Sequence, residues 1–330
     1  MVNSVCKNGI MISCFLRLCF LLSLLLYLGC AKESDLSKLP TGEIIAWGFD
    51  SHGQVGNTPS GHDFVAISTG ERHSLALRKD GTLAAWGADM FGQVSKTPSD
   101  KGYIAISAGS YHNLALREDG TIVAWGGDTA EGLEEEFRST GQVRNTPMQN
   151  GFTAISANGE QSLALQKDGT IHVWGSNVYR QITQRPRGSD FTEISAGHMH
   201  NIALRNDNTI VAWGEYDALG LVSDTPVDNG YVKISAGVRH NLALRKDGSL
   251  VGWGWDLRNE VSDTPVDNDY VTMSVGYTHS LALKEEGSIV GWGWDPREYG
   301  LLSDIPVGNE FVAISAGNLH NLAIRSSGDY

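Results

Sequence analysis

The sequence contains ten histidines, and six of them occupy one position of a repeating pattern. These six are His73, His112, His200, His240, His279 and His320. Imidazole is a common side chain for acid–base chemistry and metal binding at neutral pH. However, the six lie in separate repeats, so they cannot converge on one metal ion or one substrate, and Gln161 fills the same position in the third repeat. We therefore expect a structural role, a hydrogen bond to a turn backbone that an amide can also make.

Acidic residues recur as well, two residues after the glycine of a Trp-Gly pair. They are Asp50, Asp89, Asp128, Asp256 and Asp295, with Asn177 in one repeat. Asp and Asn in such positions are typical of Asx turns, in which the side chain bonds the nearby backbone. We therefore predict that they shape loops, and we do not assign them to catalysis.

The remaining carboxylates offer little for hydrolysis or metal binding. An acidic loop at residues 127–140 carries Glu131, Glu134, Glu135 and Glu136, but its spacing matches no calcium-binding loop. Glycoside hydrolysis needs two carboxylates about 5–9.5 Å apart, and outside that loop only Glu215 and Glu298 are weak candidates. The sequence predicts no catalytic residue, no metal site and no cofactor, and it leaves open whether the acidic loop binds a cation.

All four cysteines, Cys6, Cys14, Cys19 and Cys30, lie within the first 30 residues. The rest of the chain therefore has no disulfide and no cysteine-bound metal. Lys7 and Arg17 precede an apolar run at residues 18–29, which suits a signal peptide and is short for a bilayer span.

The end of this apolar run, Gly29-Cys30, resembles a bacterial lipobox, although Tyr27 stands where Leu is favoured. We predict a signal peptide at residues 1–29 and a tether at 30–41 that is lipidated at Cys30. The protein would then be lipid-anchored in the cell envelope and extracytoplasmic. Simple secretion and an uncleaved membrane anchor are the alternatives.

The elements that position these residues repeat seven times from residue 42 onward. The first half of the unit reads GEIIAWG at 42–48 and GTLAAWG at 81–87, and the second half reads FVAISTGERHSLALRKD at 64–80. The repeated tryptophans are Trp47, Trp86, Trp125, Trp174, Trp213, Trp253 and Trp292, at spacings of 39, 39, 49, 39, 40 and 39 residues. Short apolar strands with a period of about 40 residues are typical of propeller blades.

These patterns predict an all-β fold at residues 42–330, a seven-bladed β-propeller of repeats of about 40 residues. The segment 79–82 (KDGT) predicts a hairpin turn in which Gly81 takes a positive φ. A short Gly-Gln-Val segment, as at residues 92–94, is expected to form a further strand. The first strand, 42–48, should pair with the last, 319–325, and close the ring so that no edge stays open.

The repeated motifs resemble those of the regulator of chromosome condensation family. The shared features are Trp-Gly-x-Asp/Asn, Gly-Gln-Val, and ISAGxxHxLALxxDG, and the register of the repeat agrees seven times. The bacterial, seven-bladed members include beta-lactamase-inhibitory protein II, which binds enzymes, and the eukaryotic founder is a nucleotide exchange factor for a small GTPase. The resemblance implies a propeller fold, and it implies function far less strongly.

One end of the predicted propeller is more varied than the other. If successive strands alternate in direction, the loop after each Trp-Gly pair and the Gly-x-x-His turn share that end, and the ten-residue insertion of the third repeat falls there too. Aromatic, Met and Arg side chains of this kind are enriched in protein interfaces. The predicted protein-binding residues are Phe49, His52, Arg72, Met90, Phe91, Tyr111, Tyr179, Arg180, Met199, Tyr216, Arg239, Trp255, Arg258, Tyr277, Trp294, Arg297 and Tyr299.

The charge balance narrows the classes of partner. The chain has 38 Asp and Glu against 25 Lys and Arg, a net charge of −13, which argues against nucleic acid. We predict a monomeric, non-enzymatic module that binds an unidentified protein, as an inhibitor or a scaffold, and meets the membrane only through a lipid or signal anchor. The alternatives are a carbohydrate-active enzyme or glycan binder, and a guanine nucleotide exchange factor by family resemblance.

Overall fold

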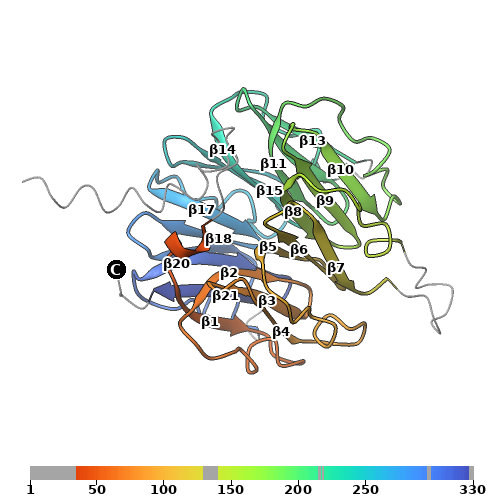
Figure 1. Cartoon of the computed structure of the whole chain (residues 1–330). Helices are drawn as coiled ribbons and strands as arrows, with labels where there is room; N and C mark the ends of the chain where they lie inside the picture. Colours follow the sequence, from red (N-terminus) through yellow and green to blue (C-terminus); the bar gives the residue numbers. More distant parts are fainter. Residues whose placement is uncertain (1–34, 129–139, 215–216, 218, 296–298, 327–330) are drawn as a thin grey trace, which may run out of the picture. The chain divides into compact units, whose positions relative to one another are not determined.

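A computed structural model describes residues 35–128, 140–214, 217, 219–295 and 299–326. The chain divides into two units, Met1–Ala31 and Lys32–Tyr330, and all described residues belong to the second. Apart from a 3-10 turn, η1 (Leu36–Lys38), the regular structure of these residues is strand (Figure 1). The predicted all-β fold is therefore confirmed.

Within the described ranges, no helix has the length and apolar character that a bilayer crossing requires.

Five sheets have three antiparallel strands, two from one repeat and the Trp-Gly strand of the next, and the remaining six strands form one sheet in which two such units are joined. The inner strands are β2 (Phe64–Thr69), β5 (Tyr103–Ala108), β8 (Phe152–Asn158), β11 (Phe191–Ala196), β14 (Tyr231–Ala236), β17 (Tyr270–Val275) and β20 (Phe311–Ala316). The middle strands are β3 (His73–Arg78), β6 (His112–Arg117), β9 (Gln161–Gln166), β12 (Asn201–Arg205), β15 (His240–Arg245), β18 (His279–Lys284) and β21 (His320–Ser326). The outer strands are β1 (Gly42–Gly48), β4 (Leu83–Gly87), β7 (Ile122–Gly126), β10 (Ile171–Gly175), β13 (Ile210–Trp213), β16 (Leu250–Gly254) and β19 (Ile289–Gly293).

The core lies between neighbouring sheets, because the middle strands are apolar on both faces. Successive side chains of a strand point to opposite faces. Leu75 and Leu77 of β3 therefore pack with Tyr103 of the next sheet, while Ala76 packs with Leu322 of the previous one. Each middle strand is buried along nearly its whole length, which is why its sequence shows no polar alternation.

The repeated tryptophans complete these cores, as predicted. All seven are buried, with 4–6% of each residue exposed. Trp86 Nε1 donates a hydrogen bond to the carbonyl oxygen of Gln54, at 2.9 Å, in the loop of the preceding repeat. The indole thus links the loop after one outer strand to the next sheet.

The hairpin between β3 and β4 also forms as predicted. Gly81 has a φ of 80°, a value that residues with a side chain adopt only at a cost. The Thr82 amide donates to Asp80 Oδ1 at 3.0 Å, which stabilises the turn.

The first and last strands pair in antiparallel register, as predicted, from Gly42 opposite Ser326 to Gly48 opposite His320. Serines link the inner strands in the same cyclic order. Each serine Oγ accepts a hydrogen bond of 2.9–3.1 Å from an amide of the next inner strand. The serine of the last inner strand, β20, accepts from the first inner strand, β2. The donor–acceptor pairs are Ala108–Ser68, Ala157–Ser107, Ala196–Ser156, Ala236–Ser195, Val275–Ser235, Ala316–Ser274 and Thr69–Ser315.

The six repeated histidines are structural, but the predicted hydrogen-bond partner was wrong. Each Nε2 contacts a side chain of the next middle strand rather than a turn backbone. The pairs are His73–Asn113, His112–Ser162, His200–Asn241, His240–Ser280, His279–Asn321 and His320–Ser74, at 2.6–2.8 Å. Gln161 keeps the cycle intact: its Oε1 accepts from Asn201 Nδ2 at 3.1 Å, and its Nε2 donates to the Gly197 carbonyl.

The Gly-Gln-Val segments are turns, so the strand predicted there is wrong. In residues 92–97, the Lys96 amide donates to the Gly92 carbonyl and the Thr97 amide to that of Val94. The Asp89 carboxylate accepts from the amides of Val94 and Ser95 at 2.8 and 2.9 Å. Because these amides are held by a side chain, they cannot join a strand ladder.

Candidate functional site

The predicted sharing of one end by two kinds of loop is confirmed. The residue after each outer strand donates its amide to the turn between the inner and middle strands of the same sheet. Trp255 donates to the Arg239 carbonyl at 2.9 Å, and Ala88 to that of Arg72 at 2.8 Å. We call this end, made of the loops after the outer strands and the turns after the inner strands, the varied face. The end with the turns between middle and outer strands is the opposite face.

Carboxylates hold the loops of the varied face in shape, as predicted. Burial works to raise the pKa of Asp89, but hydrogen bonds from the Ser95 and Val94 amides bring that pKa below its ordinary value. The sequence reading missed Asp217, which accepts from the Val222 and Ser223 amides at 2.9 and 3.0 Å. Asp217 lies three residues after the glycine of its Trp-Gly pair, whereas the other acids lie two residues after it. Its sequence separation from the amide that it binds is the same as for Asp89, which could have identified it.

Aromatic pairs bridge neighbouring sheets on the varied face. Phe91 lies 5.3 Å from Tyr111, centroid to centroid, and Phe49 lies 4.8 Å from Tyr299. Tilted and edge-on pairs at such distances are favourable arrangements of aromatic rings. These side chains are half-buried, so each pair is held in place and still presents an edge to solvent.

Two arginines form further bridges between the sheets β14–β16 and β17–β19. The Arg239 guanidinium lies 4.7 Å from the Tyr277 ring centroid, and its Nη2 donates to Tyr277 Oη at 2.7 Å. The Arg258 guanidinium lies 4.9 Å from the ring of Trp294, which is 38% exposed. Trp255 is half-buried beside Arg239. We call Arg239, Trp255, Arg258, Tyr277 and Trp294 the Arg–aromatic patch.

The other predicted binding residues vary in exposure. His52, Arg72, Met90 and Arg180 are exposed, and Tyr179 and Met199 are half-buried. Three predicted residues, Cys30, Tyr216 and Arg297, lie outside the described residues, as do Glu215, Glu298 and residues 129–139 of the acidic loop.

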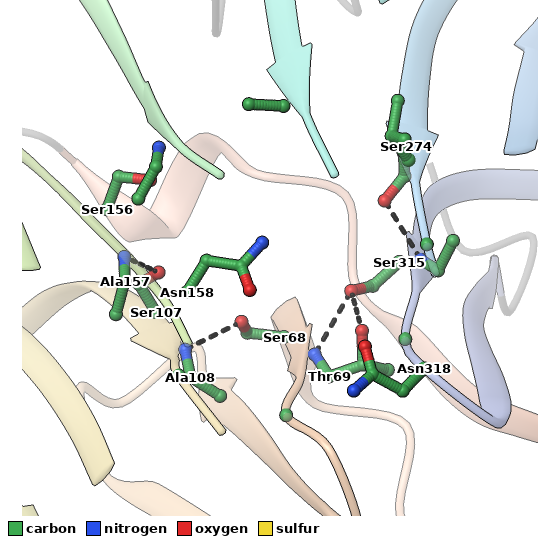
Figure 2. Close-up of a pocket in the computed structure, with 18 of the residues that line it drawn as sticks. Ser68, Thr69, Ser107, Ala108, Ser156, Ala157, Asn158, Ser274, Ser315 and Asn318 are labelled. Atoms are coloured by element: carbon green, nitrogen blue, oxygen red, sulfur yellow. Dashed lines mark hydrogen bonds between the residues drawn. The ribbon is translucent and has the colours of Figure 1, made fainter. Parts of the chain in front are cut away.

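A cavity of about 180 Å³ opens where the inner strands end on the varied face (Figure 2). Its wall contains the seven serines of the cyclic hydrogen bonds, together with small Ala and Gly residues. Glu71, Asn158 and Asn318 add larger polar side chains. The cavity is polar and lacks an aromatic wall, so it does not offer the stacking surface that binding a sugar ring would favour.

Burial sets the protonation state of the repeated histidines. Burial lowers the pKa of His73 and His200 to about 4, and that of His112, His240 and His320 to about 3, so they are neutral at physiological pH. Among the described residues, no group of three or more His, Cys, Asp or Glu side chains is arranged to hold a metal ion.

Glu193 is a residue that the sequence reading missed. It lies on the inner strand β11, at a position where four repeats have alanine, and the next repeat has Lys233 there. Burial raises the pKa of Glu193 to about 7, and Lys233 and the Ile234 amide oppose that rise. Glu193 could have been recognised from the sequence because it replaces an alanine that recurs at this position.

The opposite face is more uniform, and a set of exposed apolar residues on it was also missed. Met148, Val227, Val266 and Val307 follow the prolines that precede inner strands, and they are 96–99% exposed. They lie singly on four separate repeats, a distribution common on protein surfaces.

Repeated three-stranded sheets in cyclic contact, with one variable loop face, define a repeat protein of the propeller class. A family model described as the regulator of chromosome condensation (RCC1) repeat matches residues 64–93, 103–130 and 231–259. These three segments therefore match the RCC1 repeat, and the predicted resemblance to the family is confirmed.

Solved structures show the same fold. Prp20p from Saccharomyces cerevisiae, in a study of its binding to Gsp1p and histones, matches at a TM-score of 0.67 and 17% identity, over 88% of this chain and 93% of that one. Human WBSCR16 matches at 0.68 and 14%, over 87% and 99%. The ectodomain of the Physcomitrella patens receptor kinase CR4 matches at 0.63 and 18%, over 81% and 71%. Comparison with curated protein sequences gives no significant match.

Proposed function

We propose that residues 42–330 form a seven-bladed propeller, closed by β1 and β21, that binds a protein through the varied face without catalysing a reaction. The cyclic serine hydrogen bonds and the pairing of β1 with β21 support the closed ring. The observation that carries the binding function is the set of aromatic and arginine side chains bridging neighbouring sheets on that face.

The physical case rests on rigidity. Interface energy concentrates in a few Trp, Tyr and Arg residues, and ordering mobile side chains on binding reduces affinity. On the varied face these side chains already stack against each other, so less freedom is lost when a partner covers them. Trp294 is 38% exposed and can lose that area to a partner.

The comparisons support a protein as the partner class. Prp20p was studied for its binding to Gsp1p and histones, and yeast RCC1 has been solved bound to Kap60. Which protein this chain would bind does not follow from them, because the identities are below 20%. Similarity to the bacterial inhibitor of beta-lactamases stays a prediction from the sequence.

We further propose that the propeller is a monomer held outside the cytoplasm by the tether at residues 30–41 and a lipid on Cys30. An export signal would separate the domain from cytosolic GTPases. Nucleotide exchange, the activity of the family founder, is therefore the weaker candidate.

A glycan-directed enzyme is the second candidate, and Glu193 is the observation in its favour. A carboxyl group whose pKa is raised to about 7 can act as a general acid near neutral pH. Hydrolysis would require a second carboxylate at a suitable distance. If the chain cleaves a glycan substrate and Glu193→Gln abolishes the cleavage, the binding proposal is wrong.

The main test is crosslinking of the full chain in its host, followed by purification and identification of the crosslinked proteins. We expect a specific protein to crosslink to the wild type and to be lost in Trp294→Ala, with about 2 kcal/mol of affinity lost, as for interface anchors. Val266→Ala is the matched control, since Val266 is a 96% exposed apolar residue of the opposite face. Loss of the crosslink in the control but not in Trp294→Ala would refute the assignment of the surface.

A further inference from the structure

Cations stacked on aromatic rings occur on both faces of the propeller. On the opposite face, each stacks on the first residue of an inner strand, and on the varied face they belong to the Arg–aromatic patch. The pairs are Arg78–Phe64, Arg117–Tyr103, Arg205–Phe191, Arg245–Tyr231 and Lys284–Tyr270 on the opposite face, and Arg239–Tyr277 and Arg258–Trp294 on the varied face.

On the opposite face every stacked cation also contacts a carboxylate. The nitrogen-to-oxygen distances are 2.5–3.2 Å, and the acids precede the inner strands. The ion pairs are Arg78–Asp63, Arg117–Asp100, Arg205–Asp190, Arg245–Asp228, and Lys284 with both Asp267 and Asp269. Each stacked cation of the opposite face therefore has an acidic partner within the chain.

Among the described residues, neither Arg239 nor Arg258 has such an acid. Acids close to the patch bind backbone amides instead: Glu260 accepts from the Arg258 amide at 2.7 Å, and Asp256 accepts from the Val261 and Ser262 amides at 2.9 Å. Asp295 likewise accepts from three loop amides at 2.8–2.9 Å. Within the part of the chain that the structure describes, the two guanidinium groups thus have no carboxylate partner, in a protein whose net charge is −13.

We propose that the Arg–aromatic patch binds an acidic segment of the protein partner, whose Asp or Glu carboxylates meet Arg239 and Arg258. This inference rests on the proposed protein-binding function and names the chemistry of the partner. A guanidinium binds a carboxylate through two parallel N–H donors, and stacking leaves those in-plane donors accessible. The hydrogen bond from Arg239 to Tyr277 Oη fixes the orientation of one of them.

The charge of the whole chain makes this patch selective. A net charge of −13 repels an acidic partner from most of the surface. At this patch, an acidic segment would meet two guanidinium groups that have no acid partner among the described residues, together with aromatic rings. Such binding should weaken with salt, because the contributing charges are partly exposed.

The test is a titration of the purified full chain with three nonapeptides, followed by calorimetry. One peptide alternates glutamate with leucine and phenylalanine, and the other two replace glutamate by glutamine or lysine. We expect the glutamate peptide to bind at least tenfold more tightly than the others, and less tightly at high salt. The Arg239→Gln/Arg258→Gln double variant should lose at least tenfold in affinity, and Arg258→Lys should lose less.

The control is Arg185→Gln/Arg187→Gln, which removes the same charge from exposed positions of the opposite face. An equal loss in this control would overturn the proposal, because the effect would then reflect net charge alone. Equal binding of the glutamine peptide, if it is lost in Trp294→Ala, would refute the acidic partner but retain the protein-binding function. Tighter binding of a single-stranded oligonucleotide than of the glutamate peptide would also overturn it.

Discussion

The buried histidines predict that the propeller unfolds in mild acid. In His73, Nε2 contacts the Asn113 Oδ1, and Asn113 Nδ2 donates to the Gln93 carbonyl, so Nε2 must carry the proton. The other ring nitrogen, Nδ1, is buried without a hydrogen-bond partner. A second proton there would place an uncompensated charge in the core, which is why burial lowers the pKa of His73 to about 4.

The sign and the size of the effect follow from the difference between folded and unfolded states. An unfolded histidine has a pKa of about 6.5, so it binds a proton that the folded one refuses. The free energy of unfolding is therefore at its full value above about pH 6.5, and it decreases as the pH falls toward the pKa values of the folded histidines. At about pH 5 each such histidine costs roughly 2 kcal/mol. Five histidines with folded pKa values of about 3 or 4 would together cost on the order of 10 kcal/mol, comparable to the whole stability of a typical domain.

The assay is denaturant unfolding followed by tryptophan fluorescence at several pH values between about 7.5 and 5. We expect the free energy of unfolding to fall steeply below about pH 6.5. The chain offers a matched variant, since Gln161 and Asn201 already form the corresponding contact without an imidazole, with Asn201 as the donor. His73→Gln should therefore reduce the pH-dependent loss at about pH 5 by roughly 2 kcal/mol.

His52→Gln is the control, because His52 is an exposed histidine. This variant should keep the steep pH dependence that the buried histidines cause. A free energy of unfolding that changes by less than about 2 kcal/mol between pH 7.5 and 5 would refute the reasoning. So would a His73→Gln variant with the slope of the wild type.

Three further substitutions test the contacts and turns that stabilise the fold. Trp86→Ala should cost about 3–5 kcal/mol in denaturant unfolding, because a buried indole is lost; a cost below about 1 kcal/mol would contradict its place in the core. Gly81→Ala should cost roughly 1–2 kcal/mol, since a φ of 80° is unfavourable for alanine, and an unchanged midpoint would exclude that turn. Ser107→Ala should cost about 1–3 kcal/mol by leaving the Ala157 amide unpaired, whereas a neutral result would mean that water replaces the hydroxyl.

Much of the fold could be predicted from the sequence because the repeats agree with one another. Trp86 and Gly81 return at the same register in other repeats, so a burial pattern or a turn inferred once applies throughout. The pairing of 42–48 with the last strand followed from matching the end of the chain to an internal hairpin. The ends of the inner strands could then be placed on one face from strand direction alone.

The errors arose where the sequence of a motif does not show which group its backbone or side chain binds. Nothing local to His73 indicates that its partner is Asn113 in the following sheet. The Gly-Gln-Val segment at 92–94 looked like a short strand, but the Asp89 carboxylate claims the amides that a strand would use. Glu193 was overlooked because a single change within an alanine position has no motif, and its meaning depends on burial between sheets.

The contrast between the two faces shows how one repeat can serve both stability and recognition. Arg78 stacks on Phe64 and pairs with Asp63, and this arrangement recurs on the opposite face, where each stacked cation has an acid partner. Arg258 keeps the stacking on Trp294 but lacks the acid among the described residues. Because the frame is already held by tryptophans, serines and histidines, the loops of the varied face need not use these arginines for folding. Their donors are thus left for a partner, which is the physical basis for assigning recognition to this face.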